Sequence, residues 1–275
     1  MKHLKLNFLV SFLLVNSIFI IQIFLVVLLV KIAQITNITL NYTVAALITI
    51  FPYILFLIIF LRNRIQLIQN YIKNLFPLFL ILPILSFAIG LFIILSEIDS
   101  IFQLIIPMPD VLIELFHNNK VEQAITVFPY IISNIFKPIA KISFFLLVIY
   151  QGQLNYYNKT KSFIFTSLLF AISIYTPWSL FIFFFYSLAV LWIFDKYNSI
   201  FPCIIIELTF SISPLLLSML PIHNIHFIGN YEFKNDLILQ PFWYDISGLL
   251  LLILGFVILN WQCQKQVRSK QNRSD

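Results

Sequence analysis

The chain has 275 residues, of which 61% are hydrophobic and only 10% are charged, and its mean hydropathy of +0.97 excludes an ordinary water-soluble domain. The 17 lysines and arginines outnumber the 11 aspartates and glutamates, but they are scattered rather than gathered into a basic groove, which argues against a nucleic-acid partner. We therefore expect an all-α protein whose main partner is the lipid bilayer.

Apolar segments long enough to cross a bilayer follow one another along the chain. The first one comes after a short basic lead, residues 1–7, and resembles a signal peptide. It is long enough to span, however, and no small-residue cleavage site follows it, so we expect it to remain as the first helix of a polytopic transmembrane bundle. About eight spans are predicted, at residues 8–30, 42–61, 75–95, 128–150, 162–176, 178–194, 200–220 and 244–261.

The distribution of cations predicts the orientation of these spans. If both termini are cytoplasmic (N-in/C-in), most lysines and arginines fall in cytoplasmic segments, whereas the opposite side holds Lys31, Lys120 and Lys234. This asymmetry is the one that the positive-inside rule requires. The longest polar stretch, residues 96–124, then forms an acidic loop on the outer side.

The predicted fold is a single integral membrane domain in three sections. Residues 1–126 hold the first three spans and the acidic outer loop, residues 127–220 hold spans four to seven, and residues 221–275 hold an outer loop, span eight and a basic tail. With only five glycines in the chain and no GxxxG motif, we expect close helix crossings to rely on Ala, Ser and Thr. Gly248 and Gly255, two turns apart on span eight, predict one such contact.

Charged side chains within the spans are the most specific feature. Lys137 and Lys141 lie four residues apart on span four, on one helix face, and Glu207 lies on span seven. Lys141 and Glu207 are about 13 Å and about 11 Å from the cytoplasmic ends of their spans at 1.5 Å per residue. We expect these two to pair, because isolated charges at that depth are costly. The alternative is that each side chain snorkels or bonds separately to backbone and hydroxyl groups. For Lys137, the expected partner is Asn134, one turn away at i−3.

The order of spans and the residues on span four resemble the CPBP group of intramembrane proteases, which includes CAAX prenyl proteases and bacteriocin-processing (Abi) proteins. Those proteins carry two glutamates on a helix that follows a proline, with an aromatic residue and an arginine behind them. In the segment PIAKISFFLL, Pro138 and Phe145 fit this pattern. Lys141 and Ile142 stand where the glutamates belong, and Leu146 stands where the arginine belongs.

Two further segments are similar to family motifs in their residue spacing, but they lack the polar catalytic residues of those motifs. The second motif is a phenylalanine with a histidine four residues later, and here Phe170 is followed by Ile174. The third motif places a histidine four residues before an asparagine, and here Glu207 and Ser211 occupy those positions. The last span, in LQPFWYDISGLLLLILGFVIL, is also similar to the last helix of bacterial members.

The resemblance implies a family scaffold without the family's chemistry. In the family, glutamates and histidines activate a water for peptide hydrolysis, and none of those residues is kept here. We therefore expect a catalytically inactive pseudoprotease without a cofactor, which binds or regulates a membrane-protein partner in a bacterial plasma membrane, or in a thylakoid of a photosynthetic organism. Two alternatives stay open: an active protease that uses other residues, and a small transporter or permease subunit in which Lys137, Lys141 and Glu207 line a polar path.

Metal-binding patterns are weak in this sequence. His223 and His226 lie three residues apart in PIHNIHF, but no further ligands cluster near them. The two cysteines, Cys203 and Cys263, are too few for a disulfide framework and stand outside any metal-ligand spacing. We expect no metal site.

Overall fold

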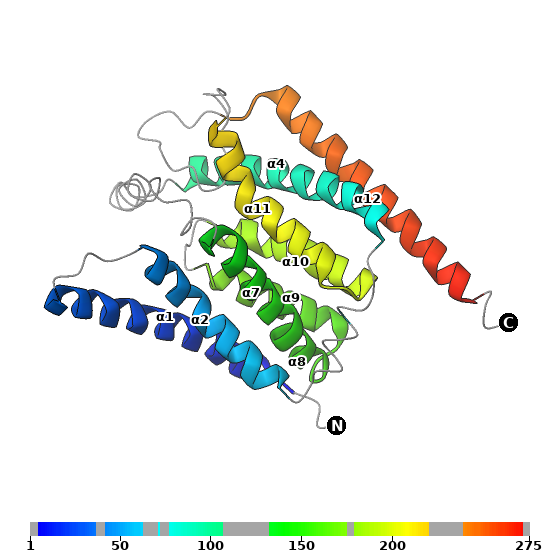
Figure 1. Cartoon of the computed structure of the whole chain (residues 1–275). Coiled ribbons are helices and arrows are strands. Elements are labelled where there is room, and N and C mark those ends of the chain that lie inside the picture. The colour runs from blue at the N-terminus through cyan, green and yellow to red at the C-terminus, as the bar shows by residue number, and fades with distance from the viewer. Residues whose placement is uncertain are drawn as a thin grey trace. The chain divides into compact units, whose positions relative to one another are not determined.

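The computed structural model describes residues 5–36, 42–62, 71, 77–106, 132–174, 179–219 and 239–271. These residues form helices and no strand, which confirms the all-α class for the described part of the chain (Figure 1). The chain divides into two compact units: unit 1 is Met1–Asn70 with Glu114–Leu191, and unit 2 is Tyr71–Ile113 with Trp192–Asp275. Each unit is made of two segments that are far apart in sequence. The three predicted sections are instead consecutive in the chain, and they stay a prediction.

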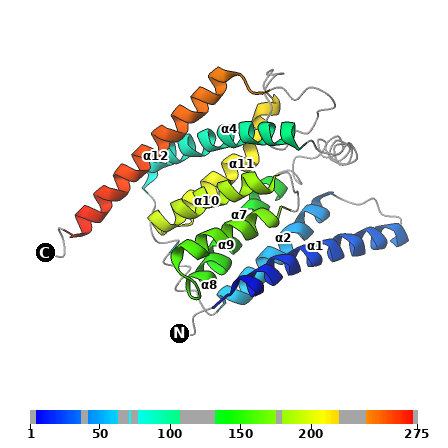
Figure 2. The same ribbon diagram turned by 180° about the vertical axis from the view of Figure 1, so that it is seen from behind.

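Unit 1 is built around the helical run that contains predicted span four. Pro138 stands near the start of α7, directly after the π-helical turn η2, and π-helical turns flank α7 on both sides. Helices α1 and α2 lie side by side in both views (Figures 1 and 2). The elements are α1 (Phe8–Thr36), α2 (Tyr42–Leu61), η2 (Ile132–Phe136), α7 (Lys137–Phe144), η3 (Phe145–Tyr150), α8 (Gln151–Leu154), α9 (Lys159–Ile172) and the first part of α10 (Leu180–Tyr197).

The residues before α1 are tied to the turn between α8 and α9. The Leu6 N–H donates to the Gly152 carbonyl at 3.0 Å, and the Phe8 N–H donates to the Tyr157 hydroxyl at 3.0 Å. The Leu6 side chain is buried and fills the space above Gly152, where an added Cβ would come within 2.5 Å of the Leu6 Cδ1. The start of α1 and the end of α8 therefore lie at the same end of unit 1.

Unit 2 is organised by two long helices, α4 and α12, that lie side by side (Figures 1 and 2). A Cβ added to Gly248 would lie 2.5 Å from the Ile93 side chain, and one added to Gly255 would lie 2.6 Å from the Phe87 backbone nitrogen. These contacts bear out the glycine contact predicted on span eight, and Gly90 of α4 adds a third glycine to it. Because later residues of α12 meet earlier residues of α4, the two helices are antiparallel. The elements of unit 2 are η1 (Leu78–Leu80), α4 (Ile81–Ile105), the end of α10, α11 (Phe201–Met219) and α12 (Phe242–Gln271).

Polar contacts mark both ends of the α4–α12 pair. At one end, the Gln240 N–H donates to the Glu97 carboxylate at 3.0 Å. At the other end, the Tyr197 hydroxyl donates to the Leu259 carbonyl at 2.9 Å, and the Lys196 ammonium contacts the Asn260 side-chain oxygen. The C-terminal ends of α10 and of the apolar part of α12 thus lie at the same end of unit 2.

The predicted outer loop begins too early. Span three was expected to end at residue 95, but α4 continues to Ile105, so residues 96–105 are helical rather than loop. The polarity there belongs to a buried stripe at helical spacing, made of Ser96, Asp99, Ser100 and Gln103. Gln103 Nε2 donates to Asp99 Oδ2 at 3.0 Å, and Ser100 Oγ donates to the Ser96 carbonyl at 3.0 Å. Polar side chains that form hydrogen bonds within their own helix can be buried without contact with water.

Every predicted span contains a helix, but the helices differ in length. Among the described residues, five helices are long enough and apolar enough to cross a membrane. Helix α9 has 14 residues, or about 21 Å, which is shorter than the hydrocarbon core of about 30 Å. The count of eight spans therefore stays a prediction. The five helices are Phe8–Lys31, Leu78–Ile105, Asn134–Leu154, Leu180–Tyr197 and Phe242–Lys265.

Candidate functional site

Lys141 occupies the centre of the candidate site. It lies on α7 with 8% of its side chain exposed. Its ammonium nitrogen is 4.1 Å from the centroid of the Phe170 ring, which comes from α9. A cation over the negative face of an aromatic ring is attracted to it, by about 2 kcal/mol when both groups are shielded from water. The lysine charge is thus compensated in part by a ring.

Phe170 belongs to a closed group of buried rings. Its ring centroid is 4.9 Å from that of Phe145 in an edge-to-face arrangement and 5.7 Å from that of Tyr186 on α10. All three side chains are fully buried. Edge-to-face pairs of this kind add about 0.5–1.5 kcal/mol each beyond the burial of their surface. Phe170 therefore contacts a ring from η3, a ring from α10 and the Lys141 ammonium.

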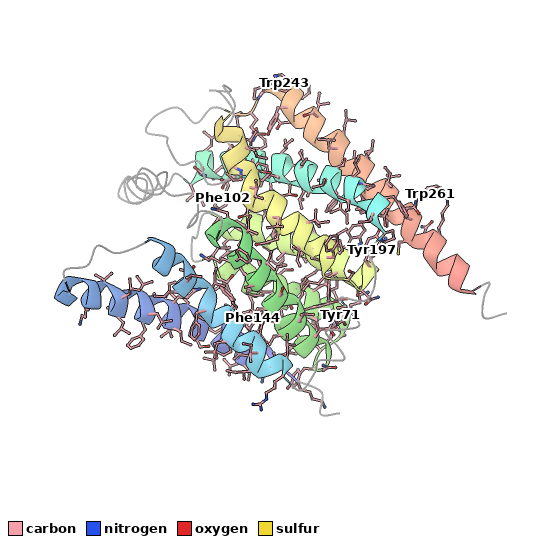
Figure 3. The ribbon with its side chains drawn as sticks, in the orientation of Figure 1. Tyr71, Phe102, Phe144, Tyr197, Trp243 and Trp261 are labelled. Carbon is pink, nitrogen blue, oxygen red and sulfur yellow. The ribbon has the colours of Figure 1, made fainter. Side chains whose placement is uncertain are left out.

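Phe144, the residue before Phe145, connects the rings around Phe170 to α2. Phe144 lies where α7 faces α2 (Figure 3). Its ring centroid is 6.0 Å from that of Tyr53 and 6.2 Å from that of Phe56, both edge-to-face. The helix that carries Lys141 is thus held on two sides by aromatic contacts.

The other span-four positions of the family pattern are part of the core. Ile142 and Leu146 are buried and apolar, so two positions where the family has a glutamate and an arginine contribute only to packing. Lys137 begins α7 and is half-buried. Within the described residues, no three His, Cys, Asp or Glu side chains are grouped so that they could hold a metal ion.

The remaining predicted site residues lie at the end of α9 and on α11. Ile174 lies just beyond the end of α9 and is half-buried. Glu207 and Ser211 lie one turn apart on α11 in unit 2, both half-buried. Because Lys141 belongs to unit 1 and Glu207 to unit 2, the predicted Lys141–Glu207 pair stays a prediction.

The structure describes the two cysteines but not the two histidines that were considered as metal ligands. His223 and His226 lie outside the described residues. Cys203 is buried and Cys263 is half-buried, and the two are not joined by a disulfide. Cys263 Sγ donates to the Lys196 carbonyl at 3.9 Å, so this thiol belongs to the contact between α10 and α12.

Sequence analysis missed a second cation on an aromatic ring, at the end of α10. The Lys196 ammonium lies 4.8 Å from the centroid of the Trp192 ring, and Trp192 stacks on Phe256 of α12 with centroids 5.0 Å apart. Tyr71 lies against the same turn of α10, with its ring 5.1 Å from that of Phe194. Burial, and next the nearby Asp195 carboxylate, raise the pKa of the Tyr71 hydroxyl, which stays neutral. The signal in the sequence was the spacing of Trp192 and Lys196, one helical turn.

A buried polar contact between α8 and α9 was also missed. Thr166 Oγ donates to Gln153 Oε1 at 2.9 Å, and both side chains are fully buried. Ser187 of α10 donates to the Ser167 carbonyl at 3.2 Å. Hydroxyl groups in apolar helices often join neighbouring helices in this way, so the serines and threonines of span five were the available signal.

Comparison of the chain with models of known protein families, with characterised proteins and with solved structures gave no match. The site around Lys141 has therefore to be interpreted from its own geometry.

Proposed function

We propose that the chain is a multi-pass integral membrane protein with both termini in the cytoplasm, most simply in a bacterial plasma membrane. The five long apolar helices support this. The contacts between helix ends within each unit support it as well. Leu6 meets Gly152, and Lys196 meets Asn260, and the predicted topology puts all four residues at the cytoplasmic side.

Two tryptophans on α12 support the same placement. Trp243 and Trp261 lie near the two ends of the apolar part of this helix (Figure 3), and their side chains are 63% and 53% exposed. Their separation along the helix is about 27 Å at 1.5 Å per residue, close to the hydrocarbon thickness of about 30 Å. Tryptophans are enriched at both membrane–water boundaries.

For the role of the protein, we propose a CPBP-like scaffold that no longer hydrolyses peptides and instead binds or regulates a membrane-protein partner. The observation that carries this proposal is the Lys141 ammonium on the Phe170 ring. A protonated lysine held on a buried ring is neither a metal ligand nor a general base. In this position it serves to hold α7 against α9.

A cleavage assay tests the loss of chemistry. The purified chain would be placed in liposomes with a fluorogenic transmembrane peptide, beside Lys141→Met and Glu207→Gln. We expect no cleavage above that of empty liposomes from any of the three. Cleavage by the unaltered chain that Glu207→Gln abolishes in a folded protein would establish an active protease. Ion flux through the same liposomes that depends on Lys137 would establish a transporter.

A crosslinking assay tests the binding role. A photo-crosslinking amino acid would replace Phe24 on α1 or Leu250 on α12, both of which are well exposed. We expect a discrete protein adduct in cells from at least one of the two helices. Lipid adducts alone at both positions would contradict a role in binding a membrane protein.

A further inference from the structure

We propose that the C-terminal end of α12 binds the headgroup of an anionic phospholipid, with Lys265 on the phosphate and Trp261 at the level of the glycerol backbone. The proposal rests on the chain spanning a membrane, as proposed above. It adds a ligand class and two residues that the proposed partner-binding role does not use.

The first observation is the geometry of the two side chains. Trp261 and Lys265 are one turn apart on α12 and both are exposed. The Lys265 ammonium lies 3.5 Å from the centroid of the Trp261 ring. The pair therefore presents a flat apolar ring and a cation on the same outward face of the helix.

The second observation is the contrast with Lys196 at the same end of unit 2. The Lys196 ammonium is engaged by the Asn260 side chain and the Trp192 ring. Lys265 is an exposed cation whose contact is a half-exposed ring. Of these two lysines, Lys265 is the one that an external anion can reach.

The third observation is charge complementarity. Arg268, Lys270 and Arg273 follow Lys265, and the only acidic residue among them is Asp275. Four cations directly after a membrane helix, on the cytoplasmic side, attract anionic lipid headgroups. A tryptophan one turn closer to the bilayer centre is at the depth of the glycerol backbone.

The opposite end of the same helix provides a matched control. Trp243 is also exposed and also ends the apolar part of α12. The charged residue close to it is Asp245, in the first turn of the helix. We therefore expect Trp243 to face lipid without a preference for anionic headgroups.

Quenching by brominated lipids tests the proposal in the full-length chain. Two reporters would keep Trp192, which is part of the helix packing: one with Trp178 and Trp243 replaced by Phe, and one with Trp178 and Trp261 replaced by Phe. Each would be reconstituted in vesicles of equal parts phosphatidylcholine and phosphatidylglycerol, with bromine on one lipid or the other.

We expect phosphatidylglycerol to quench the Trp261 reporter with at least about fivefold preference over phosphatidylcholine, since each basic residue near a charged surface contributes roughly that factor. Lys265→Gln should lower the preference about fivefold, and high salt should lower it as well. The Trp243 reporter should show equal quenching by both lipids.

Three results would overturn the proposal. Equal quenching of the Trp261 reporter by both lipids, or a preference that Lys265→Gln leaves unchanged, would remove the lipid site and leave the membrane placement intact. Absence of quenching in both reporters would remove the membrane placement as well. If the reporters fail to fold, native mass spectrometry of the otherwise unaltered chain and of Lys265→Gln decides: fewer bound phosphatidylglycerol molecules in the variant support the site, and equal numbers contradict it.

Discussion

Lys141 shows how a charge can be kept inside an apolar helix bundle. Its ammonium lies on the Phe170 ring, and Phe170 is held in turn by Phe145. If the contact stabilises the fold, the two residues should be energetically coupled. We expect a double-mutant cycle of Lys141→Met and Phe170→Leu to give a coupling free energy of about 1–2 kcal/mol. Thermal unfolding in mild detergent would measure it.

The control for this cycle uses a lysine of the same helix. Lys137 is also on α7 but is half-buried, and the cycle of Lys137→Met with Phe170→Leu should be additive within about 0.5 kcal/mol. Additive effects for Lys141 as well would show that the ring does not stabilise the cation.

Part of this site was predictable and part was not. Helical spacing predicted that Lys141 lies on one face with Lys137, and the high cost of a charge within the span predicted a partner for it. The sequence has 31 phenylalanines, so periodicity alone could not single out Phe170. The resemblance to CPBP proteins did set apart Phe145 and Phe170, and these two rings are in contact in the structure.

At the scale of elements, the α4–α12 pair depends on backbone proximity. A Cβ on Gly90 would meet the backbone of Leu252, which cannot move away alone, whereas a Cβ on Gly248 would meet side-chain atoms, Cγ2 and Cβ of Ile93. We therefore expect Gly90→Ala to lower the stability of the folded chain by about 1–3 kcal/mol, and Gly248→Ala to lower it less. Thermal unfolding of both variants in one detergent would measure the difference.

A third substitution tests whether contact with backbone explains the larger effect expected for Gly90→Ala. Gly255 also faces backbone, that of Phe87, so Gly255→Ala should resemble Gly90→Ala. If all three variants were as stable as the unaltered chain, the helices would be further apart than the structure shows.

The pairing of α4 with α12 illustrates what a single sequence leaves open. Two glycines at a spacing of two turns predict that one face of span eight is closely approached, but they do not say by which helix. The polar stripe of α4 was misinterpreted as a loop for a related reason. Gln103 donates to Asp99 within the helix, and composition alone does not distinguish an internal hydrogen bond from exposure to water.

At the scale of the whole molecule, orientation is the property most directly open to test. In a chain without native cysteines, Leu239→Cys and Lys265→Cys would stand before and near the end of α12, both at exposed positions. We expect a membrane-impermeant maleimide to label residue 239 and not residue 265 in intact cells, because the cations predict a cytoplasmic C-terminus. Lysed cells should allow both to be labelled.

Two other results would be informative. Labelling of residue 265 alone would reverse the proposed orientation. Labelling of both in intact cells would mean that α12 does not cross the membrane. Helix content and the apolar segments were predictable from composition and hydropathy, whereas the number of crossings was not, because short helices such as α9 are apolar without being long enough to span.

The tie between the first residues and the α8–α9 turn has a consequence for biosynthesis. Phe8 and Tyr157 are 149 positions apart in the chain, so their hydrogen bond cannot form until the ribosome has made that length. At about 5–20 residues per second, this takes on the order of 10–30 s. During that interval α1 has to remain in the bilayer with α2 as its neighbour. Its largely apolar surface is compatible with contact with lipid until the later helices are made. The last step in placing the N-terminus therefore belongs to the middle of translation rather than to its beginning.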